Sequence, residues 1–428
     1  MQDREFVPRA GPYAVPYSGI GSMLGQPELA AIEEVLRSAD SLSNGIFRDR
    51  FEAAFREHVG VNHAISVTSG TVALQLAIHL LDLQPGDEVI TTPQTYQATI
   101  QPLLDRDVRV RFADTGVRSP NIDPAQMAKL VTDRTRAIIL VHYGGLPVDM
   151  EPVMRLAGEC ELTVIEDAAH ALGSAYHGRR PGGIGHIGCF SFHSSKNITT
   201  LGEGGMITLN RDDWAERLHR LRSNEADMVL VGRPHRFGSS ASAPPRSLYP
   251  GAAYTHDCLA VRRAGTNATL SEPAAAVGLV QLGHLPALVA RRQMIAARIS
   301  AELAGISGVH LPAEPADTVH SYHLFTFFVD AGTFDRDELI RCLDLQGVQT
   351  YLRYFPLHLL PEWRAKGHHL GECPVAEQSW FSEHVNLPCQ PGMSDGQVEA
   401  LVATLSKALA KVRRSLTRGG AVRRKIRA

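Results

Sequence analysis

The stretch HAISVTSGTVALQLAIHLL, residues 63–81, joins a short apolar run to a helical pattern through a tight turn. The run at 63–67 has the length of a buried strand, and the segment after it has apolar residues at helical spacing. Further apolar runs follow at intervals that leave room for helices, at 88–92, 108–112, 137–141, 162–166, 187–193 and 205–209. This alternation predicts an α/β fold with a mostly parallel seven-stranded sheet flanked by helices on both faces.

The pattern changes after this region. Residues 223–265 are rich in Pro, Gly and Ser, which predicts a long loop or insertion that covers a site or an interface, or is simply mobile. TLSEP, at 269–273, has the N-cap and first-turn Pro of a long helix. A strand at 321–330, a helix at 335–347 and a strand at 348–355 then predict a smaller α+β domain. We expect an N-terminal segment and large domain at 1–285 and a small C-terminal domain at 286–428.

Composition and charge exclude several classes of protein. The chain has 428 residues and a net charge of −2, which argues against broad binding to nucleic acid or an anionic membrane surface. The basic tail at 411–428 is read as a solvated terminus, with contact to a phosphorylated ligand as the alternative. No apolar run has the length of a membrane span, and the first residues lack the apolar core of a secretory signal. We therefore expect a cytoplasmic protein.

The cysteines are scattered and form no CxxC pair, which fits reduced thiols better than a disulfide framework. HHLGEC, at 368–373, offers possible metal ligands, but no second half of a metal site matches it. We expect no bound metal. The glycines of GGIGHIG, at 182–188, precede a strand instead of following one, so a dinucleotide-binding fingerprint is rejected.

Three turns carry residues suited to one cofactor. Ser69, Gly70 and Thr71 stand at a helix start, where free N–H groups and a hydroxyl suit a phosphate, although a plain capped turn has the same composition. Asp167 ends a buried strand, where an acid is either a helix N-cap or a ligand contact. Lys196 follows another strand, as an exposed charge or as an amine held for chemistry.

Ser191 lies five residues before Lys196 and offers one more hydroxyl. A phosphate cradle, an acid for a ring nitrogen and a Schiff-base lysine, all at the turns of one parallel sheet, together indicate a pyridoxal phosphate site. The conjunction is far more specific than any one of its parts.

The chain resembles the DegT/DnrJ/EryC1/StrS family of sugar and cyclitol aminotransferases, which have the aspartate aminotransferase fold (pyridoxal phosphate fold type I). The resemblance covers about nine-tenths of the chain. It rests on motifs such as PGDEVITTPQTYQAT, VIEDAAHALGS, FSFHSSKNITTLGEGGM, GTNATLSEPAAAVGLVQL and YFPLH.

The resemblance implies a role for each matching position. Lys196 would form the Schiff base with the cofactor, and Asp167 would keep the pyridine nitrogen protonated. Tyr96 would stack on the ring and His170 would lie beside it. The phosphate would be bound by Gly70, Thr71 and Ser191, and by Asn267 of the neighbouring subunit in a homodimer with shared sites. Weaker candidates for substrate contact are His193, His323, Tyr354 and His358.

The sequence departs from the family at places where substrate or partner should lie. Arg353 precedes Tyr354 where relatives often have His, and Thr266 fills the usually aromatic place before Asn267. The insertion at 223–265 is longer than in many members that act on nucleotide sugars. These differences leave the cofactor prediction intact and the substrate open.

The resemblance implies an amino donor, L-glutamate or L-glutamine, and ping-pong transfer to a keto acceptor, with Lys196 moving the proton. The acceptor would be a ketocyclitol of the inosose type or another keto sugar, in aminoglycoside or amino-sugar biosynthesis. A nucleotide-linked keto sugar, for deoxyamino sugars or surface polysaccharide, is the alternative. Two further readings are a sugar dehydratase, which the lysine argues against, and a non-catalytic regulatory homologue, which the intact cofactor set argues against.

Overall fold

The computed structural model describes residues 11–38, 41–43, 45–224, 228–230, 259–261 and 264–418. Most of the predicted insertion at 223–265, Cys258 and the end of the basic tail therefore lie outside the described residues.

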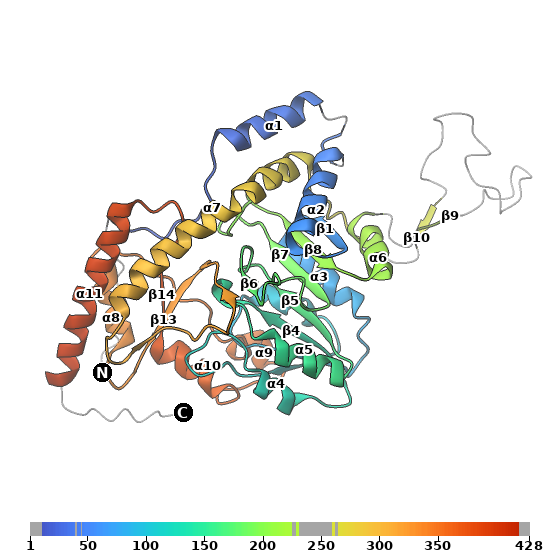
Figure 1. The fold of residues 1–428 in the computed structure, drawn as a ribbon. Coiled ribbons are helices and arrows are strands. Elements are labelled where there is room, and N and C mark those ends of the chain that lie inside the picture. The colour runs from blue at the N-terminus through green and yellow to red at the C-terminus, as the bar shows by residue number, and fades with distance from the viewer. Residues whose placement is uncertain are drawn as a thin grey trace, which may run out of the picture.

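A seven-stranded sheet with the order β1-β8-β7-β5-β4-β2-β3 forms the centre of the molecule (Figure 1). Its strands are β1 (His63–Val67), β2 (Glu88–Thr91), β3 (Arg109–Phe112), β4 (Thr135–Val141), β5 (Thr163–Asp167), β7 (Ile187–Ser191) and β8 (Gly205–Leu209). Only β8 runs against its neighbours; the pairs β2–β3, β2–β4, β4–β5 and β5–β7 are all parallel. All seven predicted strands are thus confirmed, each within two residues of its predicted ends.

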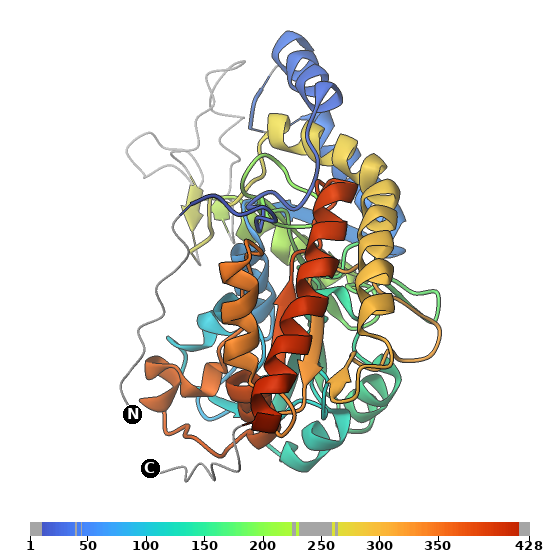
Figure 2. The same ribbon diagram turned by 90° about the vertical axis from the view of Figure 1, so that its left-hand side faces the viewer.

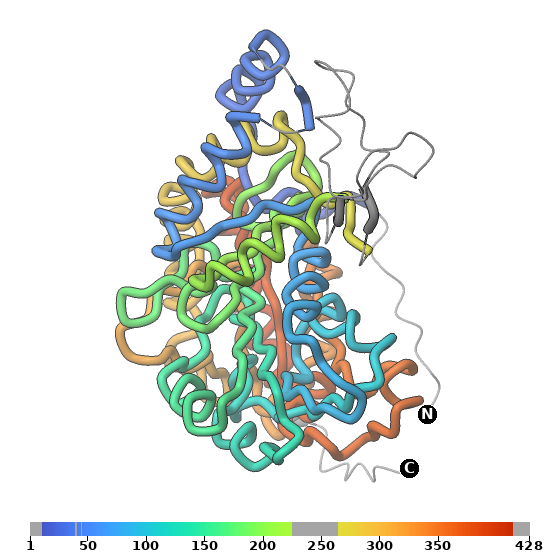
Figure 3. Tube along the Cα trace, turned by 90° about the vertical axis from the view of Figure 1, so that its right-hand side faces the viewer, coloured from blue at the N-terminus to red at the C-terminus, as the bar shows by residue number. Residues whose placement is uncertain are grey.

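The sheet is apolar on both faces, as continuous hydrophobic runs require. In β4, Ala137 and Ile139 face one core while Ile138 and Leu140 face another. Helices α3 (Gly70–Leu80) and α6 (Asp212–Arg222) cover the first face. The second face carries α2 (Ile46–Val59), α4 (Pro124–Leu130), α5 (Met150–Glu159) and the start of α7 (Glu272–Leu303). Figure 3 shows α2 and α3 on opposite sides of the strands.

Helix α7 connects two hydrophobic cores. Its first half packs with α1 (Gln26–Ser38) and α2, and its second half, from Ile295, packs with a small antiparallel sheet of order β11-β13-β14. That sheet consists of β11 (Val309–His310), β13 (Phe325–Val329) and β14 (His384–Leu387). Figure 2 shows α11 (Asp395–Arg418) between α7 and α8 (Arg336–Leu345). The predicted boundary at 285/286 falls inside α7 and stays a prediction.

One predicted strand of the small domain is wrong. Of residues 348–355, only Val348 makes a β-bridge, with Val15. The N–H of Arg353 donates instead to the side chain of Asn386, at 2.9 Å, so the segment leaves the backbone ladder. The unpredicted strand β14 lies beside β13 in the small sheet. Its four residues are all buried, so it lacks the alternation by which a short strand is found.

The remaining elements are short. They are β6 (Ala175–Tyr176), β9 (Met228–Leu230), β10 (Leu259–Val261), β12 (Thr318–Val319), α9 (Pro361–Arg364), α10 (Pro374–Gln378), η1 (Gln97–Thr99), η2 (Gln101–Leu103), η3 (Tyr143–Gly145), η8 (Leu357–Leu359) and η9 (Ser379–Glu383). Among the described helices, α7 is long and apolar enough to cross a membrane by length and composition alone. Its packing against both cores accounts for the same apolar residues, including Leu285 and Ile299.

Candidate active site

A cavity of about 390 Å³ lies at the carboxyl edge of the large sheet. The chain enters it directly after β1, β2, β5 and β7, and residues 353–354 reach it from the C-terminal part of the chain. The structure brings nine of the twelve predicted site residues to this cavity: Gly70, Thr71, Tyr96, Asp167, His170, Ser191, His193, Lys196 and Tyr354. Because parallel strands end at one edge, residues more than a hundred positions apart meet here.

The start of α3 forms one end of the cavity. The Ser69 hydroxyl caps the helix by accepting a hydrogen bond from the Val72 N–H at 3.2 Å. A Cβ added to Gly70 would lie 2.7 Å from the Cβ of Ser191, so only glycine fits at this approach. The Ser191 hydroxyl is thereby held beside free helical N–H groups. Such a cradle suits a phosphate group.

Asp167 ends β5 with its carboxylate buried at the cavity. One oxygen accepts a hydrogen bond from the Thr99 hydroxyl at 2.7 Å, and the other accepts one from the Ala169 N–H at 3.1 Å. Burial raises the pKa of Asp167 despite these hydrogen bonds. A protonated pyridine nitrogen would supply the positive charge that this buried carboxylate needs.

Lys196 lies at the same cavity, half-buried, after the end of β7. Burial lowers the pKa of its amine to about 8, against the opposing effect of Asp167, while Arg353 lowers it further. An amine with this pKa is partly neutral near physiological pH, so it can attack a carbonyl carbon and can accept a proton. The sequence left Lys196 between an exposed charge and a reactive amine, and its lowered pKa favours the second.

His170 is buried in a column of rings beside the cavity. Its ring stacks on His323 at a centroid distance of 4.3 Å and on Tyr354 at 5.9 Å. Burial holds the pKa of His170 well below its usual value. The Gly144 N–H donates to its Nδ1 at 3.3 Å, so the ring proton is on Nε2, which faces the Tyr354 hydroxyl at 3.3 Å. His170 is thus a neutral donor in a fixed orientation.

The other predicted contacts sit at the rim. Tyr96 is 51% exposed, with its ring centre 5.8 Å from that of Tyr354. His193 is exposed and its Nδ1 lies 3.0 Å from the Ser195 hydroxyl.

The structure does not bring three of the predicted residues to the cavity. His323 is buried behind His170, where its Nδ1 lies 3.1 Å from the amide oxygen of Asn197. Asn267 is exposed in a separate hollow shared with Arg48 and Arg222. His358 is buried 2.8 Å from Glu377.

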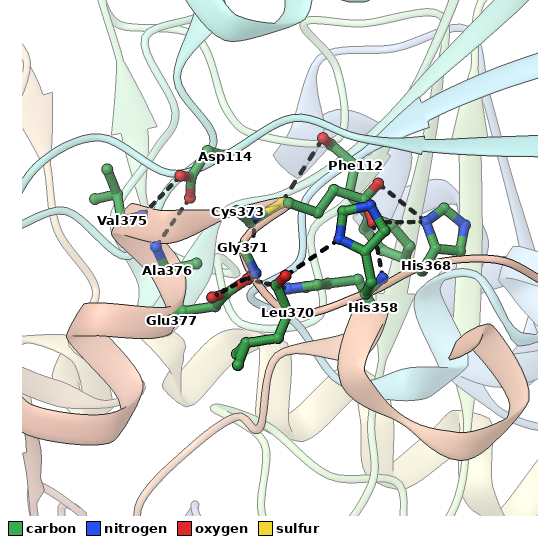
Figure 4. A network of polar contacts seen from close by, with 12 residues as sticks. Phe112, Asp114, His358, His368, Leu370, Gly371, Cys373, Val375, Ala376 and Glu377 are labelled. Carbon is green, nitrogen blue, oxygen red and sulfur yellow. Dashed lines mark hydrogen bonds and ion pairs between the residues drawn. The ribbon is translucent and has the colours of Figure 1, made fainter. Parts of the chain in front are cut away.

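The network around His358 is structural in this arrangement (Figure 4). Glu377 also accepts hydrogen bonds from the Gly371 and Cys373 N–H groups, and Asp114 accepts two from the first turn of α10. These contacts fasten the segment after Tyr354 to the end of β3. His368 pairs with Glu372 at 3.0 Å in the same region.

Within the described ranges no three His, Cys, Asp or Glu side chains form a group that could hold a metal.

Two residues at the site were missed or undervalued by sequence reasoning. Thr99 orients Asp167 from a 3₁₀ turn, and no spacing rule connects these two positions. Arg353 lines the cavity. The sequence did carry a signal for it, because a charged residue stands beside Tyr354 where relatives often have His.

The residues present fit pyridoxal phosphate. The turn at Gly70 would hold the phosphate, Asp167 would lie at the ring nitrogen, and Lys196 would form the covalent bond to the cofactor. This fold, with this site, defines a pyridoxal-phosphate-dependent aminotransferase of fold type I. The chain belongs to the DegT/DnrJ/EryC1/StrS aminotransferase family, whose model matches residues 23–406.

Similar proteins span nearly the whole chain. The dTDP-3-amino-3,4,6-trideoxy-alpha-D-glucose transaminase of Streptomyces venezuelae is 35% identical over 369 residues, covering 86% of this chain and 88% of that protein. The GDP-perosamine synthase of Caulobacter vibrioides is 32% identical, covering 86% and 91%. Among solved structures, the aminotransferase TlmJ from Streptoalloteichus hindustanus is 31% identical with a TM-score of 0.80, covering 92% and 99%.

Proposed function

We propose that the protein transfers an amino group from L-glutamate or L-glutamine to the keto group of a sugar or cyclitol. The observation that carries this proposal is that Lys196, with its lowered pKa, and buried Asp167 line one cavity. Pyridoxal phosphate, when bound, supplies an electron sink for the carbon that gains or loses a proton. The remaining chemistry belongs to the residues of this chain.

Each residue has a defined task in this proposal. Gly70, Thr71 and Ser191 bind the phosphate and set the position of the ring. Asp167 keeps the ring nitrogen protonated, while Tyr96 covers the exposed face of the ring. The free Lys196 amine would take the proton from the α-carbon of the amino donor and deliver it to C4′ of the cofactor. A lysine suits this step because its amine moves on a flexible stem between two carbons.

The acceptor is proposed as a keto sugar joined to a nucleotide, because two relatives over most of the chain are named for dTDP- and GDP-linked amino sugars. A free ketocyclitol of the inosose type is the second candidate. It is favoured by Arg353 at the cavity and by the long segment 223–265, both of which depart from the pattern of many nucleotide-sugar members.

A panel of acceptors tests this function. Enzyme whose cofactor has been converted to pyridoxamine phosphate by an amino donor is mixed with nucleotide-linked keto sugars and with inososes. The return of the visible absorbance of the pyridoxal form is then followed. One acceptor class should restore it rapidly, with an aminated product detected by mass spectrometry. An enzyme whose cofactor absorbance no amino donor bleaches would not be an aminotransferase of this kind. Bleaching by donors but no return with any acceptor would reject the sugar and cyclitol classes.

We also propose a homodimer in which Asn267 completes the phosphate site of the partner. Asn267 is exposed outside its own chain's cavity, which fits a contribution in trans. Helix α1 projects from the body of the molecule (Figure 1), and exposed apolar side chains cluster in sequence around it: Ile20, Met23, Leu24, Leu29, Leu36, Leu42 and Ile46. Such a face favours burial against another subunit.

Mixing two inactive variants tests the shared site. Lys196→Ala and Asn267→Ala subunits, reassociated in equal amounts, should regain about a quarter of wild-type activity, because half of the dimers then hold one intact site. No recovery, together with verified subunit exchange, would reject the contribution of Asn267 across the interface.

A further inference from the structure

Arg353 is the one arginine that lines the active-site cavity in the described part of the chain. Its guanidinium lies 5.3 Å from the ring centre of Tyr17, 5.8 Å from that of Tyr351 and 5.9 Å from that of Tyr354. The side chain is half-buried. The cation is therefore held among aromatic rings at the wall of a reactive cavity.

The backbone of Arg353 is fixed from two directions. Its N–H donates to Asn386 in β14 at 2.9 Å. Its carbonyl accepts hydrogen bonds from Gln94 at 3.2 Å and from the hydroxyl of Tyr143. Gln94, Tyr143 and Asn386 are buried, so the arginine starts from a rigid anchor. A fixed anchor lowers the entropy that a bound ligand must overcome.

The guanidinium lacks an acidic partner. No ion pair with a carboxylate joins it among the described residues. Burial acts to lower the pKa of Arg353, but the hydroxyls of Tyr17 and Tyr354 raise it above its usual value. Neighbouring Arg292 differs, because it donates to the backbone carbonyls of Gly21 and Cys389 in the interior. A partly desolvated cation without a counter-ion favours an anionic ligand.

We propose that Arg353 binds the carboxylate of the substrate, and that this carboxylate is the α-carboxylate of the amino donor. The proposal rests on the aminotransferase function above and names a residue that selects its donor. Arg353 recognises a carboxylate because its planar fork matches two carboxylate oxygens.

The position of Arg353 decides between possible sources of the anion. Arg353 and Lys196 line the same cavity, and the positive charge of Arg353 lowers the pKa of the lysine amine. The α-carboxylate of an amino acid is attached to the carbon that carries the reacting nitrogen, so it must lie beside Lys196. The phosphates of a nucleotide-linked sugar lie beyond the sugar ring and further from the reacting carbon. Proximity to Lys196 therefore favours the donor carboxylate.

The experiment compares wild type with Arg353→Gln, both loaded with cofactor. L-Glutamate and L-isoglutamine, in which an amide replaces the α-carboxylate, are titrated while the visible absorbance of the cofactor is followed. We expect the half-saturating L-glutamate concentration to rise about 100-fold in Arg353→Gln, because the variant loses one charge-assisted pair between guanidinium and carboxylate. The half-saturating concentration of L-isoglutamine should change less than about threefold, because its α-amide makes no such pair. Arg353→Lys should lie between, since it keeps the charge but not the fork.

A second readout needs no turnover. Binding of glutarate, which carries carboxylates but no amine, is measured by calorimetry, and it should be lost in Arg353→Gln. Arg155→Gln serves as the matched control, because Arg155 is exposed on α5, away from the cavity, and should behave as wild type.

Two outcomes would overturn the assignment. The first is an Arg353→Gln enzyme that still prefers L-glutamate over L-isoglutamine as strongly as wild type. The second is an unchanged donor titration together with a raised KM for the keto acceptor, which would assign Arg353 to an anionic group of the acceptor. Failure of the proposed function looks different, because wild type itself would then show no bleaching with any amino donor, while glutarate binding would still report on Arg353.

Discussion

The substitution Gly70→Ala tests the phosphate cradle directly. The added Cβ would lie 2.7 Å from the Cβ of Ser191 and 3.2 Å from its Cα and Oγ. Carbon atoms in contact prefer about 3.5–4.0 Å, so the start of α3 or the end of β7 must move. Neither is a flexible side-chain tip. We expect a loss of about 1–3 kcal/mol in the free energy of unfolding of the cofactor-free protein, typical of overpacking.

The same movement should weaken the binding of the cofactor. Displacing the first turn of α3 takes its N–H groups away from the phosphate, and we expect the dissociation constant of pyridoxal phosphate to rise by about tenfold or more. Urea denaturation of the cofactor-free protein and absorbance titration with pyridoxal phosphate measure the two effects separately.

Two variants make the test specific. Gly158→Ala places the same methyl group in α5, where a Cβ meets nothing within 4 Å, and should stabilise by about 0.5–1 kcal/mol. Gly70→Ala combined with Ser191→Gly removes the clashing Cβ and should recover most of the lost unfolding free energy. If Gly70→Ala behaves like Gly158→Ala in both assays, α3 is not held against Ser191 and the cradle is misplaced.

Three further predictions follow from the buried charges. Asp167→Asn should leave cofactor binding within about tenfold of wild type but slow the donor half-reaction by about 100-fold or more in stopped-flow absorbance, because a neutral amide does not hold the ring nitrogen protonated; an unchanged rate would exclude Asp167 from this task. The rate at which cofactor-free protein forms its covalent bond to pyridoxal phosphate should rise with pH and level off above about 8, since burial lowers the pKa of Lys196 to about 8 and only the neutral amine attacks; a rise that continues to pH 10 would contradict this. Glu166→Gln should destabilise the protein by about 3–5 kcal/mol at pH 7. Burial alone would raise the pKa of Glu166, but hydrogen bonds from His142 and the backbone lower it. The stabilisation by Glu166 is therefore fully present above the pKa of this group in the unfolded chain, and it is lost as pH falls through the lower pKa of the folded protein. The difference in unfolding free energy between wild type and variant, measured by urea denaturation, should therefore shrink in acid.

The sequence by itself determined the large domain and the cofactor. Continuous apolar runs such as that of β4 are buried on both faces of a parallel sheet, and this pattern is local, so it can be found without knowing the fold. Gly70, Asp167 and Lys196 could be grouped because each lies at or just after the carboxyl end of a strand, and parallel strands present these ends at one edge.

The strand at 321–330 and the helix at 335–347 of the small domain were also predicted from sequence, and β13 and α8 lie there. Tertiary structure alone decided how the strands of the small domain pair and how the side chains of the site are arranged. The segment 348–355 has apolar and aromatic residues suited to a strand, yet the side chain of Asn386 takes the hydrogen bond of Arg353 and no ladder forms. His358 was predicted at the substrate and instead pairs with Glu377 in the interior, while Arg353 lies at the cavity. The physical reason is that a strand pattern is set by neighbours in the chain. The partner of a charged or polar side chain is set by packing between segments that are distant in sequence.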